Sequence, residues 1–221
     1  MPARHPFIQS GSVPGEGDSC RRCGTCCKKG GPCLHIDDLP LIKEGRLPVS
    51  ALFTIRAGEP AWDNIRNHIG GAEQDIIKIR NRAGERGCIF FNRSRNSCDI
   101  YAFRPLECRA LKCWDIKNII EVYDQQRLSR RDFLSGNTQL WEVVVAHQEV
   151  CDYGKVGRAV KNNDLDTVEY LIRYDGAYRE LVVEKRLLDA AELDFFLGTP
   201  LSLTIRRYDI PEAEPDLEPP E

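Results

Sequence analysis

Cys20-Arg-Arg-Cys-Gly-Thr-Cys-Cys27 places four thiol side chains within eight residues of the chain. Cysteine thiolates are strong ligands for zinc and iron, and a two-residue gap allows successive sulfur atoms to curl around one small metal centre. The stretch therefore predicts a metal-binding module whose irregular local structure is organised by the metal that it holds.

A second group of cysteines follows further along the chain. Cys98, Cys108 and Cys113 form a run with gaps of nine and four residues, and Cys88 lies just upstream of it. Arg104 and Arg109 flank Cys108, and Pro105 places that cysteine near the start of a helix. Positive charge and the helix dipole both stabilise a thiolate, and N–H donors to sulfur tune a metal centre.

Arg104 and Arg109 are therefore the expected cofactor-binding side chains, which would donate hydrogen bonds to the sulfurs that bind the metal. The alternative is that Arg104 and Arg109 only pair with nearby acids such as Glu107 or Asp115.

Two kinds of metal centre fit the spacing. Cys20, Cys23 and Cys26 can clasp three irons of a four-iron cluster, and a fourth thiolate from the second group would complete the site. Alternatively, a C-x2-C pair and a distant second pair form a tetrahedral zinc site, and two such quartets would use eight of the ten cysteines. Because neighbouring side chains diverge, the adjacent Cys26 and Cys27 favour two centres over one.

Composition limits the other functional classes. The chain has 221 residues and a net charge of −3, with no stretch close to the roughly 20 apolar residues that span a bilayer. The N-terminus lacks the apolar core of a signal peptide, so we expect a cytoplasmic protein with reduced thiols rather than a disulfide framework. Without its acidic last thirteen residues the chain is nearly neutral, which argues against a nucleic-acid partner.

The expected fold is α+β, with a cysteine-rich domain of short strands packed against a helical C-terminal half. We expect flexible tails at residues 1–17 and 208–221, a metal-binding domain at 18–115 and a mostly helical region at 116–207. Strands are expected at 52–55, 75–80 and 201–207, and a hairpin at 88–101 with a cysteine on each arm. Helices are expected at 36–45, 105–111, 116–126, 130–134, 139–149, 156–162, 165–173 and 184–196.

Three sequence blocks in the same order, at 20–27, 88–91 and 98–113, closely resemble the YkgJ-type cysteine-cluster family. That family is described as a zinc- or iron-chelating domain. The resemblance covers residues 18–115. It implies that the metal-site cysteines are Cys20, Cys23, Cys26, Cys27, Cys88, Cys98, Cys108 and Cys113. Cys33 and Cys151 lie outside the matching blocks, and we expect Cys151 to be a small buried apolar residue. The same pattern also occurs in flagellin lysine N-methylases.

Three functions follow as expectations. The first is an iron–sulfur protein that transfers electrons or handles a cluster. Its protein partner is unknown, and a redox protein is one candidate. The second is a zinc-stabilised interaction module. The third is part of a methylase-like enzyme, although no glycine-rich loop follows a strand to bind a cofactor. His35 and His147 are further candidate nitrogen ligands, but we expect surface or capping roles for both.

Overall fold

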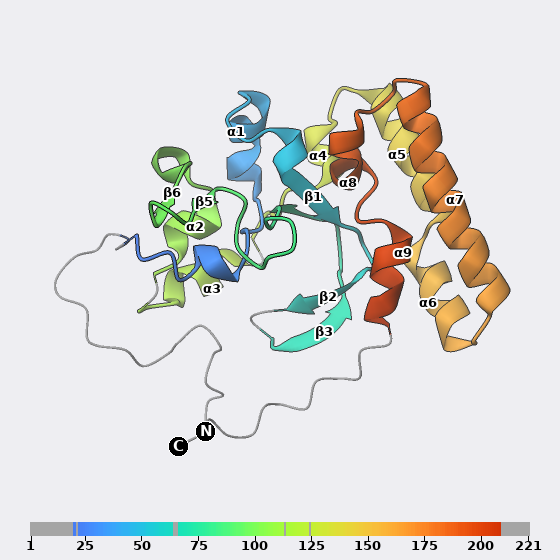
Figure 1. Ribbon diagram of the computed structural model, residues 1–221, viewed down its shortest axis with the longest axis horizontal. Coiled ribbons are helices and arrows are strands. Elements are labelled where there is room, and N and C mark those ends of the chain that lie inside the picture. The colour runs from blue at the N-terminus through green and yellow to red at the C-terminus, as the bar shows by residue number, and fades with distance from the viewer. Residues whose placement is uncertain (1–19, 21, 64–65, 113, 124, 209–221) are drawn as a thin grey trace, which may run out of the picture. The chain divides into compact units, whose positions relative to one another are not determined.

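The computed structural model describes residues 20, 22–63, 66–112, 114–123 and 125–208 (Figure 1). Cys113 and both predicted tails, apart from Tyr208, therefore lie outside the described residues. The chain divides into two compact units, residues 1–53 with 77–128 and residues 54–76 with 129–221. We call them the cysteine unit and the helical unit. They interleave along the sequence, whereas the sequence analysis expected one boundary near residue 115.

The cysteine unit consists of short elements. Its helices are η1 (Cys27–Lys29), η2 (Ile36–Asp38), α1 (Leu39–Lys43), η3 (Val49–Ala51), η4 (Tyr101–Phe103), α2 (Leu106–Ala110) and α3 (Lys117–Tyr123). Strand β1 (Leu52–Ile55) pairs with β4 (Ile76–Ile79), although residues 54–55 of β1 and residue 76 of β4 are counted in the helical unit. Strand β5 (Phe91–Asn92) pairs with β6 (Ser97–Cys98) in an antiparallel hairpin. Burial alternates along β4, where Ile77 and Ile79 are fully buried, as expected for a strand with one face on a core.

The helical unit is built around longer helices whose N-termini are capped by side chains. It contains the antiparallel pair β2 (Pro60–Asp63) and β3 (His68–Gly71), then α4 (Arg130–Phe133), α5 (Thr138–Val150), α6 (Tyr153–Lys161), α7 (Leu165–Glu184), η5 (Ala190–Glu192), α8 (Leu193–Phe196), α9 (Leu201–Thr204) and η6 (Ile205–Arg207). Asn137, Asp152 and Asp164 each accept a backbone N–H of the first turn that follows. These caps explain where α5, α6 and α7 begin.

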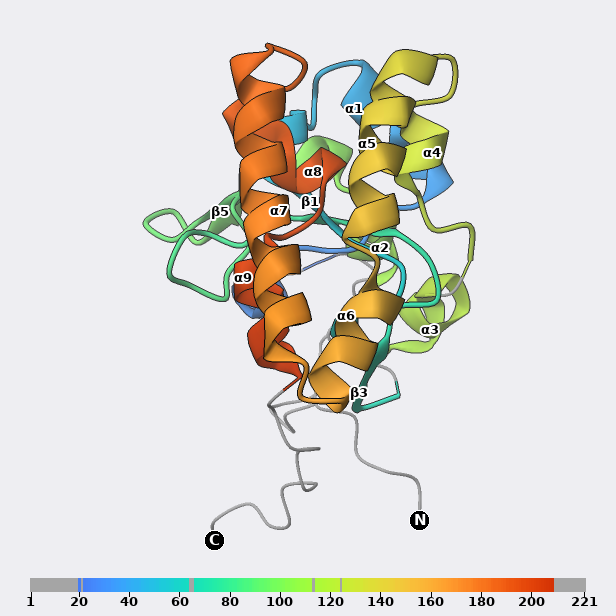
Figure 2. The same ribbon diagram turned by 90° about the vertical axis from the view of Figure 1, so that its right-hand side faces the viewer.

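Helices α5 and α6 lie beside α7 in both views (Figures 1 and 2), and α9 also contacts α7. A core of apolar side chains joins these helices, formed by Cys151, Tyr153, Val156, Leu171 and Leu201. The predicted α+β class is therefore confirmed, with short strands and a helical C-terminal half.

Some predicted elements are wrong. Residues 201–207, expected as a strand, form α9 and η6. The β-branched residues there suggested a strand, but the buried positions, Leu201 and Thr204, have the three-residue spacing of a helix. The helix expected at 184–196 is interrupted after Glu184, where Arg186 adopts a φ of 54°. The strands of the predicted hairpin lie closer to the turn than expected, and the pair β2–β3 was not predicted.

Candidate metal centre

The first cysteine run folds into a tight turn. The N–H of Lys28 donates to the carbonyl of Gly24 at 2.9 Å, and the N–H of Lys29 donates to that of Cys26 at 3.0 Å. Gly24 has a φ of +76°, and a Cβ at this position would lie 2.5 Å from the ring of Phe91. Only glycine therefore allows the run to fold this closely over the buried Phe91 of β5.

The hairpin brings the second group of cysteines to the first. The N–H of Cys88 donates to the carbonyl of Cys27 at 2.8 Å. Phe91 and Cys98 are directly opposed in the β5–β6 pair. Two cysteines of the second group are thereby held next to the turn that carries Cys26 and Cys27.

Two carboxylates position α2, which carries Cys108: the buried Asp38 and the half-buried Glu107. The Asp38 carboxylate accepts the N–H of Leu106 at 2.9 Å and the N–H of His35 at 3.0 Å. The Glu107 carboxylate accepts the N–H of Cys33 at 2.8 Å. Asp38 is fully buried, so these bonds replace water as the partner of its charge. The start of α2 is therefore bound to Asp38 of η2, and Glu107 of α2 itself binds the backbone of Cys33.

Four of the predicted ligands converge. Burial raises the pKa of Cys108 well above its ordinary value, and the neighbouring charges of Cys26, Cys88 and Cys98 raise it further. Burial raises the pKa of Cys88 to about 11, with Cys98 and Cys26 again adding to the effect. Burial is also the largest cause of the raised pKa of Cys98. Cys26 therefore acts on all three described cysteines of the second group, and Cys98 acts on both Cys88 and Cys108.

This donor set fits a metal. Thiols that share a desolvated region cannot all ionise by themselves, because each thiolate disfavours the next. A bound cation reverses this balance, since it stabilises the thiolates that ligate it. Cys26, Cys88, Cys98 and Cys108 are the residues that would hold such a metal, and a metal bound there would compensate their negative charge.

The other predicted ligands are less enclosed. Cys20 is half-buried, and its sulfur accepts the N–H of Arg22 at 3.4 Å. Cys23 is exposed, with its sulfur 3.2 Å from the hydroxyl oxygen of Thr25. The thiols of Cys26 and Cys27 are hydrogen-bonded to each other, and this bond is the largest cause of the raised pKa of Cys26. Ligation by Cys20, Cys23, Cys27 and Cys113 stays a prediction.

The two arginines named from the sequence differ in position. Arg104 donates from Nε to the carbonyl of Tyr101 at 3.1 Å, and its positive charge lowers the pKa of Cys98 against the effect of burial. Arg109 is exposed, and its charge acts on Asp38. A role of either arginine behind a bound metal stays a prediction.

Cys33 and His35 belong to the network that supports α2. Cys33 is buried, and burial is the largest cause of its raised pKa, while Arg127 opposes that effect through a hydrogen bond and its charge. His35 is 1% exposed, and Nε2 lies 3.4 Å from a carboxylate oxygen of Glu107. His35 occupies the N-cap position of η2, where its N–H donates to Asp38, but its side chain makes no cap hydrogen bond and is buried rather than at the surface.

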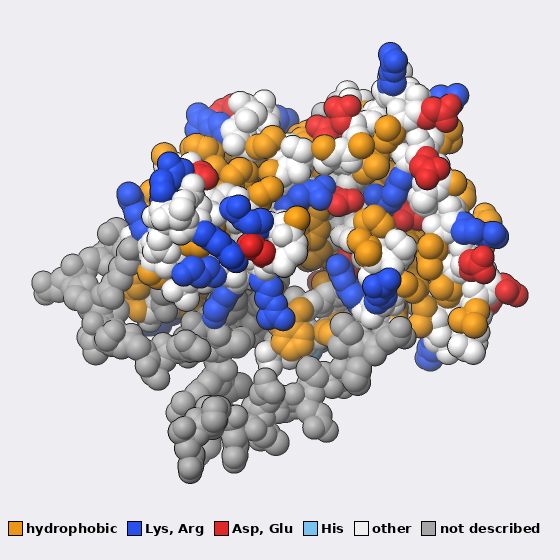
Figure 3. Space-filling view, viewed as in Figure 1, with side chains coloured by type: hydrophobic (Ala, Val, Ile, Leu, Met, Phe, Trp, Pro, Cys, Tyr) orange, Lys and Arg blue, Asp and Glu red, His pale blue; other side chains and the backbone are white. Residues whose placement is uncertain are grey.

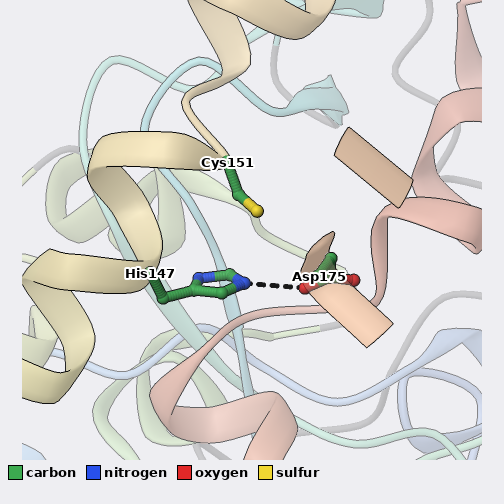
Figure 4. A group of neighbouring side chains, drawn as sticks. All are labelled: His147, Cys151 and Asp175. Carbon is green, nitrogen blue, oxygen red and sulfur yellow. Dashed lines mark hydrogen bonds and ion pairs between the residues drawn. The ribbon is translucent and has the colours of Figure 1, made fainter. Parts of the chain in front are cut away.

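A separate group lies in the helical unit, where His147, Cys151 and Asp175 point toward one another (Figure 4). Their potential ligand atoms lie within 4.8 Å, and all three residues are buried. The expectation of a surface or capping role for His147 is wrong, because its side chain is fully enclosed. Cys151 is fully buried in the apolar core, as predicted.

Charge argues against a metal in this second group. The Asp175 carboxylate accepts Nε2–H of His147 at 2.7 Å, Nε–H of Arg179 at 2.9 Å and N–H of Leu201 at 2.8 Å. The positive charges of Arg56 and Arg179 both act on His147. A cation would have to displace these bonds and approach two guanidinium groups, so we interpret the group as a buried ion network that links α5, α7 and α9.

Comparison with known proteins agrees with the geometry. The model of one protein family, described as "CxxCxxCC: Putative zinc- or iron-chelating domain", matches residues 19–130, which is half of the chain. This chain belongs to the CxxCxxCC family. No curated protein and no solved structure gave a match. The match spans both cysteine runs, so the chain is a metal-binding cysteine-cluster protein.

The family match also extends beyond the blocks seen in the sequence. It includes Cys33, His35 and Arg127, the residues of the buried network next to α2. Periodicity and spacing did not indicate this network, because its members come from three separate segments.

Among the described residues, no helix is both long and apolar enough to cross a membrane.

Proposed function

We propose that this CxxCxxCC-family chain is a cytoplasmic iron–sulfur protein that transfers electrons or handles a cluster. The observation that carries the proposal is the convergence of Cys26, from the C-x2-C-x2-C run, with Cys88, Cys98 and Cys108. One thiolate from the first run and three from the second group provide enough donors for a four-iron cluster.

The C-x2-C-x2-C spacing around Cys26 supports iron–sulfur over a single zinc ion, because this spacing is typical of thiolates that bind separate irons of a four-iron cluster. Backbone N–H groups of Phe90 and Ile100 also donate to the sulfurs of Cys88 and Cys98. Such N–H donors to cysteine sulfur tune the reduction potential of a cluster.

The exposure of the ligands suits exchange with a partner. Cys23 is exposed, and Cys20, Cys27 and Cys98 are half-buried. A centre whose ligands reach the surface can be approached closely by a second protein, which both electron transfer and cluster transfer require.

The deciding experiment is anaerobic purification followed by metal analysis, sulfide analysis and a visible spectrum on the same sample. We expect a brown protein that contains iron and acid-labile sulfide. A colourless protein with stoichiometric zinc would contradict the proposal, because zinc has a filled d shell and no visible absorption. That result would support the zinc-stabilised interaction module instead.

A further inference from the structure

The cysteine unit carries a strong positive charge that the net charge of the whole chain conceals. Its described residues include sixteen Lys and Arg but only eight Asp and Glu, whereas those of the helical unit include thirteen and seventeen. The excess is greatest at residues 78–112, with nine basic and three acidic side chains. The positive charge is therefore concentrated in the part of the chain that holds the second group of cysteines.

Exposed basic side chains come together around the candidate metal centre. Figure 3 shows Lys and Arg gathered on this part of the surface. We define the basic face by six exposed residues: Arg22, Lys28, Arg82, Arg86, Arg93 and Arg95. They belong to the first cysteine run, the loop before Cys88 and the hairpin turn, three segments that all adjoin the candidate ligands.

Side-chain contacts hold these three segments next to one another, around Phe91 and Glu85. Arg82 donates to the carbonyl of Phe91 at 2.7 Å, and its charge acts on Cys88. The ammonium of Lys28 lies 5.7 Å from the centre of the Phe91 ring. Arg93 and Arg82 both approach the Glu85 carboxylate, at 2.8 Å and 3.8 Å. The positive charges therefore surround the thiols rather than being scattered over the unit.

We propose that this basic face docks an acidic surface of a partner protein over the metal centre. Complementary charge steers two proteins into productive encounters and sets their orientation. An acidic protein surface is the kind of partner that the proposed function requires. The docking itself is argued from charge, and only its use for electron or cluster transfer rests on the proposed function.

Two observations favour a protein partner over a nucleic acid. The Tyr101 ring has Arg22 4.0 Å and Arg104 3.8 Å from its centre, so guanidinium groups already occupy the space that a stacked base needs. The face also includes Ile89, which is 37% exposed, and two acidic residues, Glu85 and Asp99, in ion pairs. A mixture of apolar, basic and acidic groups is typical of protein interfaces.

The test uses a fluorescently labelled twenty-residue polyglutamate peptide, a single-stranded oligonucleotide and phosphatidylserine vesicles as probes of the full-length protein. The variant is Lys28→Glu with Arg86→Glu and Arg93→Glu. The matched control carries Arg131→Glu, Lys161→Glu and Lys185→Glu, three exposed residues of the helical unit with the same total charge change. Metal content and circular dichroism verify that each variant is folded.

We expect peptide affinity to fall about tenfold or more in the first variant, to change less than about twofold in the control, and to weaken with added salt. Equal affinity of the two variants would overturn the inference. An oligonucleotide or vesicle that binds more tightly than the peptide at physiological salt would overturn the choice of a protein partner. A colourless zinc protein that passes this test would contradict the proposed function alone, and an iron–sulfur protein that fails it would contradict only the docking.

Discussion

The backbone N–H of Cys88 donates to the carbonyl oxygen of Cys27 at 2.8 Å. This bond joins the first cysteine run to the second group through the main chain. The buried Phe91 and the close contact at Gly24 fix the same junction through packing. The polypeptide therefore brings the thiols near one another, and a metal adds the charge that lets them ionise.

Substitution of the converging thiols should abolish metal binding. Cys108→Ser removes a thiol next to Cys26, Cys88 and Cys98, and Cys26→Ser removes the neighbour that acts on all three described thiols of the second group, so we expect large losses of bound metal. The control is Cys151→Ala, which removes a fully buried thiol of the helical unit without adding a polar group. Metal analysis of the purified variants provides the measurement. A loss at Cys151 equal to that at Cys26 would show that the boundary of the site is wrong.

Removal of the metal should unfold the cysteine domain at residues 18–115. Structural metal sites contribute folding energy directly, and the elements around the cysteines are too short to be stable alone. Circular dichroism before and after chelation, with hydrogen exchange to locate the change, measures the effect. An unchanged spectrum and unchanged exchange in a sample shown to be metal-free would refute the prediction.

Asp38 should be needed to position Cys108. Asp38→Ala leaves the N–H groups of Leu106 and His35 without their acceptor, so we expect a loss of about 2 kcal/mol or more in unfolding free energy. Metal occupancy should fall as well, because α2 is no longer fixed. Asp37→Ala is the control, since Asp37 is exposed and should change stability by less than about 0.5 kcal/mol. Similar stability and occupancy in the two variants would contradict the role of Asp38.

The sequence predicted local chemistry better than long-range arrangement. Helix starts were predictable where a capping residue precedes an apolar run, as at Asn137. The family followed from the three cysteine blocks, because thiolate spacing is a local property, whereas the ligand set that the resemblance implies stays a prediction. The strand expected at 201–207 failed because its conformation depends on a distant partner, the Asp175 carboxylate that accepts the N–H of Leu201.

The charged surroundings of the site were hidden for a related reason. Net charge averages over the whole chain, so the acidic helical unit cancelled the basic cysteine unit. The buried network of Cys33, His35 and Glu107 was also not predictable, because single polar residues in irregular segments carry no periodicity. Only the fold shows which of them are buried together.

His147 should make the helical unit less stable in mild acid. Burial lowers the pKa of His147, and the charges of Arg56 and Arg179 lower it further, although Asp175 opposes them. Its contribution to stability is therefore complete above the unfolded-state pKa of about 6.5. As the pH falls below that value, the unfolded chain binds a proton that the folded protein excludes. Stability should then fall by at most about 1.4 kcal/mol per pH unit until the lowered pKa is reached.

Urea unfolding between pH 7.5 and pH 5.0, compared among variants, measures this effect. His147→Gln places an amide that can still donate to Asp175 but cannot titrate, so its stability should depend less on pH across this window. The control is His68→Gln, which replaces an exposed histidine of the same unit and should leave the pH dependence unchanged. Identical slopes for the wild type and His147→Gln would show that His147 is not the residue that excludes the proton. In that case the acid sensitivity across this window would have to arise from other groups. The Asp175 carboxylate is not one of them, because its pKa is held below its ordinary value by His147, Arg179 and the N–H of Leu201, so it stays ionised in both states at these pH values.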